Sequence, residues 1–245
     1  MRVAIIADIH GNLVALEAVL ADIKKRGVDK IVCLGDVATI GPQPRETIAR
    51  LRDIGCRCVM GNHESWMLDP SLLDGLEGAP DWFVNLIRWS TQQLTRDDLE
   101  YLGRFQSTID IPVDMGKSIF CFHGSPRSNE HSIYPATPPG ELNKMLAGHR
   151  SLFMAGAHTH AQMLRQHEGI LIINPGSVGI PFEQRLPNKP LRFLPWAEYA
   201  IVHSGDGTVN VDLRRIGPDL AQVLNAPMDP TYPAREIWRK NWKGY

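Results

Sequence analysis

The chain has 245 residues, of which 43% are hydrophobic, and this is enough apolar material to bury the core of one large domain. Its formal net charge is −1 and no long run of one sign occurs, so neither a nucleic-acid polymer nor a membrane surface is an expected partner. The four cysteines form no CxxC pair, and every apolar stretch is shorter than the about 18 residues of a membrane helix, so we expect a soluble cytoplasmic protein.

The first part of the chain alternates apolar runs with amphipathic segments. Residues 2–9 (RVAIIADI) form a short, nearly continuous apolar run, which predicts a strand buried on both faces. Residues 12–27 place apolar side chains at helical spacing and end in Arg26 and Gly27, which predicts a helix. The segments KIVCLGD, PRETIARLRDIG and CRCVMGNHE repeat this order, and together they predict a βαβαβ unit with a largely parallel sheet.

The middle of the chain, residues 65–105, is expected to form a helical cap. Its segment DWFVNLIRWSTQQL is amphipathic, and Thr95 followed by Asp98 resembles a capping box. Strand patterns then return in KSIFCFHG, SLFMAGAHTH, QMLRQH, GILIINPGSVG, EYAIVHS and TVNVDLRRIG, and the GDG between the last two indicates a hairpin. Because no low-complexity linker separates the halves, we predict an α/β fold of two packed sheets with helices outside, in a single domain over residues 1–245.

The C-terminal tail, residues 225–245, begins with NAPMDPTYP, which predicts a loose segment at 225–233. Trp238 and Trp242 follow at i, i+4 spacing, which predicts a helix docked on the body of the protein. A contact between subunits of a homo-oligomer is the alternative interpretation of this helix.

Polar side chains that can bind ligands or take part in a reaction come directly after the predicted strands. They are Asp8, His10, Asp36, Asn62, His63, His123, His158 and His160. Ligands of α/β sheets bind beyond the carboxyl ends of the strands, so we expect these side chains at one rim. In an extended chain, His158 and His160 would project to the same side. Carboxylate, amide and imidazole donors together suit Mn, Fe, Co, Ni or Zn, and their number favours two ions.

The motifs D-x-H, G-D, G-N-H-E, H-G and H-x-H, in this order between residues 8 and 160, resemble those of the calcineurin-like metallophosphoesterase superfamily. NPGSVG at 174–179 resembles its branch of small single-domain bacterial and archaeal phosphoesterases. Any one motif alone is a weak signal, but five in order are a strong one. The resemblance implies a four-layer α/β/β/α sandwich with a binuclear metal centre at the ends of the strands.

Carried over to this chain, the resemblance implies two metal sites. One ion would be held by Asp8, His10, Asp36 and His160, and the other by Asp36, Asn62, His123 and His158. Asp36 would bridge the two ions, and a metal-bridging hydroxide would attack phosphorus in line. His63 would face the substrate and stabilise the phosphoryl oxygens or protonate the leaving group, while Glu64 would orient the loop.

These features predict metal-dependent hydrolysis of a phosphate ester, either a phosphodiester or a phosphomonoester, with a small or nucleotide-like organic part. The alternative is a catalytically silent metal-binding scaffold of the same fold, as in a retromer subunit that has lost activity. Because all seven implied ligands and His63 are present, the sequence favours the enzyme. A Rossmann-like nucleotide binder is set aside because no G-x-G-x-x-G follows the first strand.

Thr39 and Ile40 depart from one branch of the superfamily, since protein serine/threonine phosphatases carry an aspartate and an arginine at these positions. This chain therefore resembles that branch less. Arg45 and Arg127 lie near the GD and HGSP motifs and are candidate phosphate contacts, although loop arginines are more often solvated. The histidines that match no motif are interpreted as structural; they are His131, His149, His167 and His203.

Overall fold

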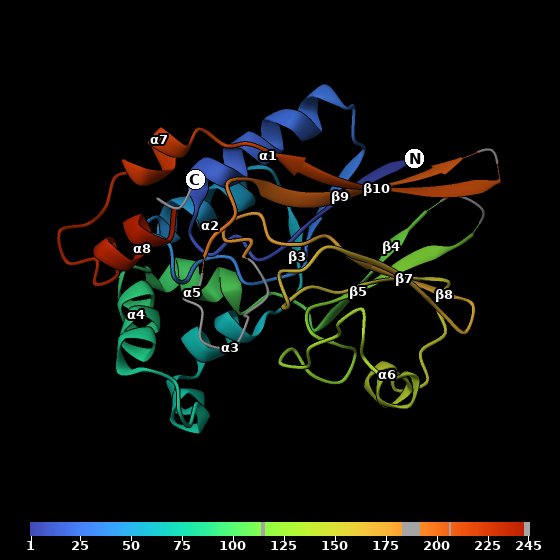
Figure 1. The fold of residues 1–245 in the computed structure, drawn as a ribbon, viewed down its shortest axis with the longest axis horizontal. Helices are drawn as coiled ribbons and strands as arrows, with labels where there is room; N and C mark the ends of the chain where they lie inside the picture. The colour runs from blue at the N-terminus through green and yellow to red at the C-terminus, as the bar shows by residue number, and fades with distance from the viewer. Residues whose placement is uncertain (114–115, 183–191, 206, 243–245) are drawn as a thin grey trace.

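Two five-stranded sheets lie face to face within the described residues, which are 1–113, 116–182, 192–205 and 207–242 of a computed structural model (Figure 1). The first sheet has the order β10-β9-β1-β2-β3 and the second the order β4-β5-β6-β8-β7. The strands are β1 (Arg2–Ile6), β2 (Lys30–Cys33), β3 (Arg57–Cys58), β4 (Thr108–Pro112), β5 (Ser118–Phe122), β6 (Phe153–Ala155), β7 (Met163–His167), β8 (Ile170–Asn174), β9 (Ala197–Gly205) and β10 (Thr208–Ile216). Each sheet is mixed, with β1, β2 and β3 parallel in the first and β5, β6 and β8 parallel in the second.

Helices cover the outer faces of both sheets, with α1 beyond the first sheet and α6 beyond the second (Figure 1). The helices are α1 (Leu13–Lys25), α2 (Pro44–Asp53), α3 (Asn62–Leu68), the 3-10 helix η1 (Pro70–Gly75), α4 (Asp81–Gln92), α5 (Arg96–Leu102), α6 (Pro139–Leu146), α7 (Leu220–Leu224) and α8 (Arg235–Trp242). This arrangement confirms the predicted α/β/β/α sandwich. No helix among the described residues is both long and apolar enough to cross a membrane.

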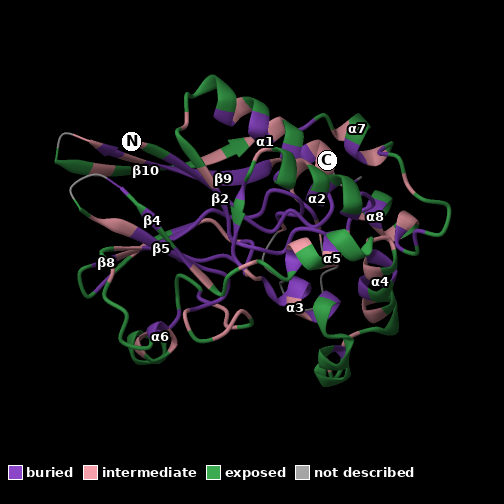
Figure 2. Ribbon diagram, turned by 180° about the vertical axis from the view of Figure 1, so that it is seen from behind, coloured by how far each residue is buried: buried purple, intermediate pink, exposed green. Residues whose placement is uncertain are grey.

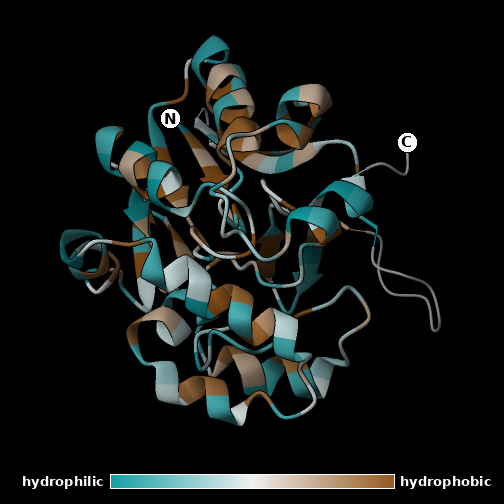
Figure 3. Ribbon diagram, turned by 90° about the vertical axis from the view of Figure 1, so that its left-hand side faces the viewer, coloured by the Kyte–Doolittle hydropathy of each residue, from teal (hydrophilic) through white to brown (hydrophobic). Residues whose placement is uncertain are grey.

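The apolar run of β1 explains how the layers are joined. Successive side chains of a strand point to opposite faces, so Val3 and Ile5 face the second sheet while Ala4 and Ile6 face the helices. All four side chains are fully buried. In Figure 2 the buried residues run along the facing strands, and in Figure 3 the helices show hydrophilic residues outward and hydrophobic residues toward the sheets.

Helix termini also follow the sequence signals. The Asn12 side chain accepts a hydrogen bond from the backbone N–H of Ala15 and caps α1. Thr95 and Asp98 form the predicted capping box at the start of α5. The predicted hairpin joins β9 and β10, although Asp206 of its GDG lies outside the described residues.

Several elements differ from the sequence prediction. Strand β4 and helix α6 were not predicted, because β4 is short and ends in Pro112 and α6 begins with Pro139 in a proline-rich loop. Strand β3 is only two residues long, since beyond it Val59 forms a single bridge to Gln106.

The prediction of a loose segment at 225–233 is wrong for its C-terminal end, at Tyr232. Tyr232 is 3% exposed, and its hydroxyl donates a hydrogen bond to the backbone oxygen of Ile40. The buried hydroxyl is thereby satisfied, and the chain is fixed to the body just before α8.

Helix α8 packs on the body, as the tryptophan spacing predicts; residues 243–245 of the predicted tail lie outside the described ones. Trp238 and Trp242 are each 2% exposed, and their rings pack against Phe193. The indole N–H of Trp238 donates to the backbone oxygen of Val223 at 3.2 Å. The tail is therefore part of a hydrophobic core and not a loose end.

We expect Trp238→Ala to lower the free energy of unfolding by about 3–5 kcal/mol, because it removes a buried aromatic ring and leaves a cavity. Trp82→Ala is the matched control, since Trp82 is 46% exposed and its loss should cost far less. Urea denaturation of both variants measures the difference. Equal destabilisation would contradict the docking of α8, as would an unchanged melting temperature after deletion of residues beyond Pro233.

Candidate functional site

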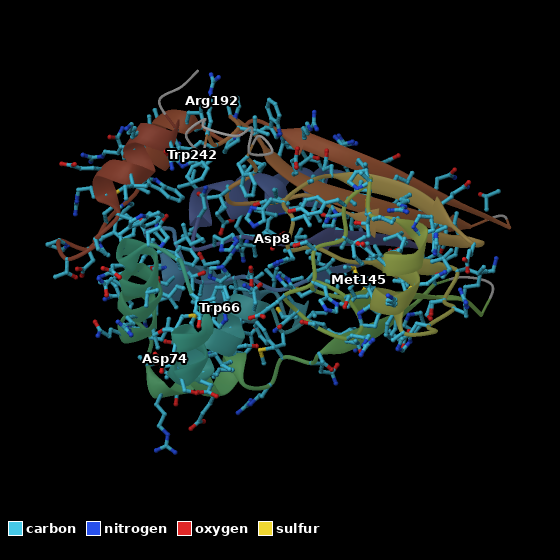
Figure 4. All side chains as sticks on the ribbon, turned by 60° about the horizontal axis from the view of Figure 1, so that its bottom comes forward. Asp8, Trp66, Asp74, Met145, Arg192 and Trp242 are labelled. Carbon is cyan, nitrogen blue, oxygen red and sulfur yellow. The ribbon has the colours of Figure 1, made fainter. Side chains whose placement is uncertain are left out.

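The ends of four strands and the start of α3 bring all the sequence-predicted polar residues together at one edge of the sheets. These eight residues form the rim. Asp8 and His10 follow β1, Asp36 follows β2, His123 follows β5, His158 and His160 follow β6, and Asn62 and His63 open α3. His158 is half-buried and the others are buried. Figure 4 shows Asp8 near the centre of the molecule.

One group of donors consists of Asp8, His10 and His160. The Nε2 atoms of His10 and His160 lie 3.1 Å apart, and His160 Nε2 lies 3.9 Å from Asp8 Oδ1. Two nitrogens bound to one ion at ~2.1 Å and at a right angle would be separated by about 3 Å. These three side chains therefore could hold one ion.

A second group consists of Asp36, Asn62, His123 and His158. Asn62 Oδ1 lies 2.9 Å from His123 Nε2 and 3.0 Å from His158 Nδ1. Asp36 Oδ2 lies 3.4 Å from His123 Nε2. The same oxygen lies 3.7 Å from His10 Nε2, so Asp36 joins this group to the first.

Backbone carbonyl groups set the orientation of two imidazoles. His123 Nδ1 lies 2.6 Å from the oxygen of Leu34, and His160 Nδ1 lies 2.9 Å from the oxygen of Ile180. A carbonyl oxygen can only accept, so Nδ1 carries the hydrogen in both rings. When the rings are neutral, their Nε2 lone pairs point into the rim and are available to a metal ion.

The carboxylate of Asp8 has no partner that explains its burial. Its side chain is fully buried, yet neither oxygen has a hydrogen bond within the described part of the chain. Burial raises the pKa of Asp8 well above its usual value, because the ionised form loses its hydration. A bound cation would supply the missing partner, so the donor set fits a metal ion.

Burial and neighbouring charges also shift the pKa values of the other titratable groups, and a histidine must be neutral at the nitrogen that binds a metal ion. Burial lowers the pKa of His158 to about 3 and that of His160 to about 4, so both rings are neutral at pH 7. Burial disfavours the charged forms of His123 and Asp36 as well, but their mutual attraction outweighs it. The pKa of His123 is therefore raised to about 9 and that of Asp36 is lowered.

The backbone of the rim is strained, which corrects one sequence expectation. AHTH is not extended, because His158 has a φ of 70° and His160 a φ of 55°. Asp8, His10 and Asp36 also have left-handed φ values, of 52°, 48° and 55°. Such conformations cost on the order of 1 kcal/mol or more per non-glycine residue and persist only where surrounding contacts enforce them. The bend sends His158 to one donor group and His160 to the other.

Glu64 is one such contact, and it orients the loop as the sequence indicates. Its carboxylate accepts hydrogen bonds from the backbone N–H groups of Asp36 at 2.8 Å, Val37 at 2.7 Å and Gly61 at 3.0 Å. A Cβ atom at Gly61 would lie 2.2 Å from Asp36 Oδ1. Only glycine therefore lets the two loops approach closely enough for this arrangement.

The NPGSVG segment braces the opposite side of the rim. Ser177 donates from its hydroxyl to the backbone oxygen of Asp8 at 2.7 Å. Asn174 donates from its side-chain amide to the oxygen of Ala157 at 3.2 Å and to the Thr159 hydroxyl at 3.0 Å. These bonds fix the loops that carry the carboxylate and the two histidines.

Thr39 has a place in the site that the sequence did not reveal. Its hydroxyl lies 2.6 Å from His63 Nδ1 and 3.4 Å from His10 Nδ1. His63 Nε2 in turn lies 3.8 Å from Asp36 Oδ2. The sequence signal for this role is the position of Thr39, three residues after Asp36.

Several other sequence candidates lie outside the rim. Arg45 forms an ion pair with Asp98 at 3.3 Å, and Arg127 donates to the oxygen of Lys144. Each remaining histidine has a structural partner: His131 contacts Ser125, His149 stacks on Phe120, His167 contacts Asn143 and His203 contacts Asp212.

Residues 1–190 match the family model of the calcineurin-like phosphoesterase superfamily domain. An uncharacterized protein of Methanocaldococcus jannaschii is 32% identical over 194 residues, which cover 73% of this chain and 76% of that protein. The crystal structure of a metallophosphoesterase from Sphaerobacter thermophilus is similar with a TM-score of 0.70 and 27% identity, covering 98% of this chain and 100% of that chain. A hypothetical protein of Pyrococcus horikoshii OT3 shares the fold, with a TM-score of 0.76, 22% identity and 91% of each chain covered.

Divalent ions should stabilise the protein through Asp8. A saturating concentration near 100 times the dissociation constant adds about 2.7 kcal/mol, which corresponds to a rise of about 5–10 °C in melting temperature. Asp8→Asn should reduce this rise, because it removes the carboxylate. Asp212→Asn, which changes a half-exposed carboxylate outside the rim, should keep it. Differential scanning fluorimetry after chelation and after manganese addition measures both, and an equal rise in the two variants would contradict a metal at Asp8.

Proposed function

The chain belongs to the calcineurin-like phosphoesterase superfamily, and from this premise we propose that it hydrolyses a phosphate ester with two divalent metal ions. The observation that supports two ions best is the meeting of two donor groups at Asp36. Its Oδ2 atom lies 3.7 Å from His10 Nε2 in one group and 3.4 Å from His123 Nε2 in the other. A single ion would leave one group of buried donors without a partner.

In this proposal Asp8, His10, Asp36 and His160 hold one ion, and Asp36, Asn62, His123 and His158 hold the other. The mixed donor set favours Mn, Fe, Co, Ni or Zn. Bound divalent ions neutralise the phosphoryl oxygens and lower the pKa of water toward neutrality. The residues of the chain fix where the phosphoryl group binds, because their positions are held by Glu64 and the 174–179 segment.

His63 is proposed as the residue that acts on the leaving group. Its ring borders a cavity beside the rim, while its Nδ1 atom is held by the Thr39 hydroxyl. If Thr39 donates this hydrogen bond, the Nε2 N–H of the neutral ring can donate a hydrogen bond to a phosphoryl oxygen. To protonate a leaving-group oxygen, the ring must first gain a second proton, with its Nδ1–H then donating to the Thr39 oxygen. Burial lowers the pKa of His63, so the neutral ring is the form present at pH 7.

The proposed substrate is a small or nucleotide-like phosphate ester, and the protein acts on it in the cytoplasm. Four free, buried cysteines suit a reducing compartment. Residues 65–105, which contain η1, α4 and α5, serve as the helical cap of a single domain, and a homo-oligomer is part of the proposal.

Asp36→Asn should abolish turnover, because it removes the charge on which both donor groups converge. We expect a fall of at least about 100-fold in kcat, with loss of bound metal. Metal content by mass spectrometry and hydrolysis of a chromogenic phosphodiester and phosphomonoester, with added divalent ions, measure both effects. Asp212→Asn is the control outside the rim.

Three results would change the proposal. Full activity of Asp36→Asn would exclude the mechanism. Two bound ions without hydrolysis of any ester would favour the catalytically silent scaffold. No bound metal under any loading would mean that the rim is not a metal site.

His63→Asn should impair poor leaving groups more than good ones. If His63 protonates the leaving oxygen, kcat for an alkyl ester should fall by about 10²–10⁴, whereas a nitrophenyl ester, whose leaving group needs no proton, should lose much less. Steady-state kinetics on both esters, with metal content checked, tests this. An equal loss on both esters would assign His63 to stabilisation of the phosphoryl oxygens instead.

A further inference from the structure

A large cavity opens directly beside the rim. It has a volume of about 760 Å³, and the rings of His10, His63 and His160 form part of its wall. Cavities of about 300–1,000 Å³ are typical of sites that bury a whole small molecule. Because these three imidazoles belong to the rim, a phosphoryl group bound there would place its organic part in or next to this cavity.

The cavity is apolar and aromatic up to the rim itself. The Phe83 ring centroid lies 5.9 Å from that of His63, in an edge-on arrangement, and the Phe182 ring centroid lies 4.9 Å from that of His160. Leu86 of α4 and Trp238 of α8 belong to the same wall. An organic group attached to a phosphoryl group at the rim would therefore contact hydrocarbon and aromatic surface at once.

The described residues that line the cavity include no lysine, arginine, aspartate or glutamate. Tyr134 and Asn241 supply uncharged polar atoms only. A second phosphate or a carboxylate placed there would lose its hydration without gaining a counter-charge from the described wall residues, which is costly in an apolar site. An uncharged apolar group would gain by leaving water.

The wall is built by parts of the chain that differ from the metal motifs. Phe193, Tyr232 and Trp238 lie beyond residue 190, where the match to the family model ends. Trp82 and Phe83 come from the cap helix α4. The cap and the tail therefore supply most of the cavity wall, and Ile40, Ile180 and Phe182 join them beside the rim.

We propose that the cavity selects phosphate esters with a single phosphoryl group and a bulky, uncharged, apolar or aromatic organic group. This inference rests on the proposed function, because it takes the rim as the phosphoryl site. Nucleoside polyphosphates and other multiply charged esters are disfavoured substrates.

Binding of phosphonates to the manganese-loaded full chain tests the proposal without turnover, because the C–P bond is not hydrolysed. Methylphosphonate, phenylphosphonate, naphthylmethylphosphonate and 2-carboxyethylphosphonate are compared by titration calorimetry. We expect naphthylmethylphosphonate to bind at least about tenfold more tightly than methylphosphonate, and the carboxylated probe no more tightly than methylphosphonate.

A matched pair of variants locates the effect. Ala79→Trp fills the cavity from a loop, so it should remove most of the naphthyl preference while leaving methylphosphonate binding unchanged. Ala136→Trp, in an exposed loop outside the cavity, should preserve the preference. Phe83→Ala should also reduce it, by removing aromatic surface.

The outcomes separate this proposal from the proposed function. Equal affinity for all four probes, or tightest binding of the carboxylated probe, would overturn the apolar selectivity even if the protein hydrolyses esters. A naphthyl preference that Ala79→Trp abolishes, in a protein that hydrolyses no ester, would support the cavity but overturn the hydrolase. Failure of every phosphonate to bind would overturn the selectivity, whereas hydrolysis of the chromogenic esters would still decide the proposed function.

Discussion

The carboxylate of Asp36 is the charge on which the rest of the site depends. Its Oδ2 atom lies within 3.4–3.8 Å of ring nitrogens of His10, His63 and His123, and its Oδ1 atom accepts from the backbone N–H of His63. A fully buried charge is tolerated only when compensating groups surround it. Four separate strand ends and one helix start must therefore converge on this side chain, and two packed sheets with parallel central strands provide that convergence.

The meeting of the strand ends would not by itself keep the donor side chains in place, because the backbone that carries them is strained. The left-handed φ values of Asp8, Asp36 and His160 are local costs that the surrounding loops must outweigh. Glu64 and the 174–179 segment do this through hydrogen bonds to backbone groups beside the donors. A rigid rim of this kind is suited to holding a phosphoryl group in a fixed geometry, since little reorganisation is left for the reaction itself.

Stability and proposed selectivity share the same side chains. Trp238 fixes α8 to the body and also lines the cavity beside His63 and His160. Phe83 similarly packs in the cap and contacts the His63 ring. The core between the two sheets, by contrast, contains residues such as Ile5 and Cys121 that do not reach the site. Under the proposed selectivity, changes in the cap and tail would alter the organic group that is accepted while the rim stays intact.

Local sequence determined the strand runs, the helix caps and the candidate donors after each strand, because these depend on periodicity and on residues only a few positions apart. It did not predict β4, where Ile109 and Ile111 alternate with polar residues over too short a stretch, nor the bend of AHTH. The contacts between His10 and His160, and between Asn62 and His158, span 150 and 96 residues of chain. The role of Thr39 and the apolar cavity arise in the same way, from surfaces distant in sequence. Only the packing of the two sheets, the cap and the tail decides such features, because no local pattern records which distant surfaces will meet.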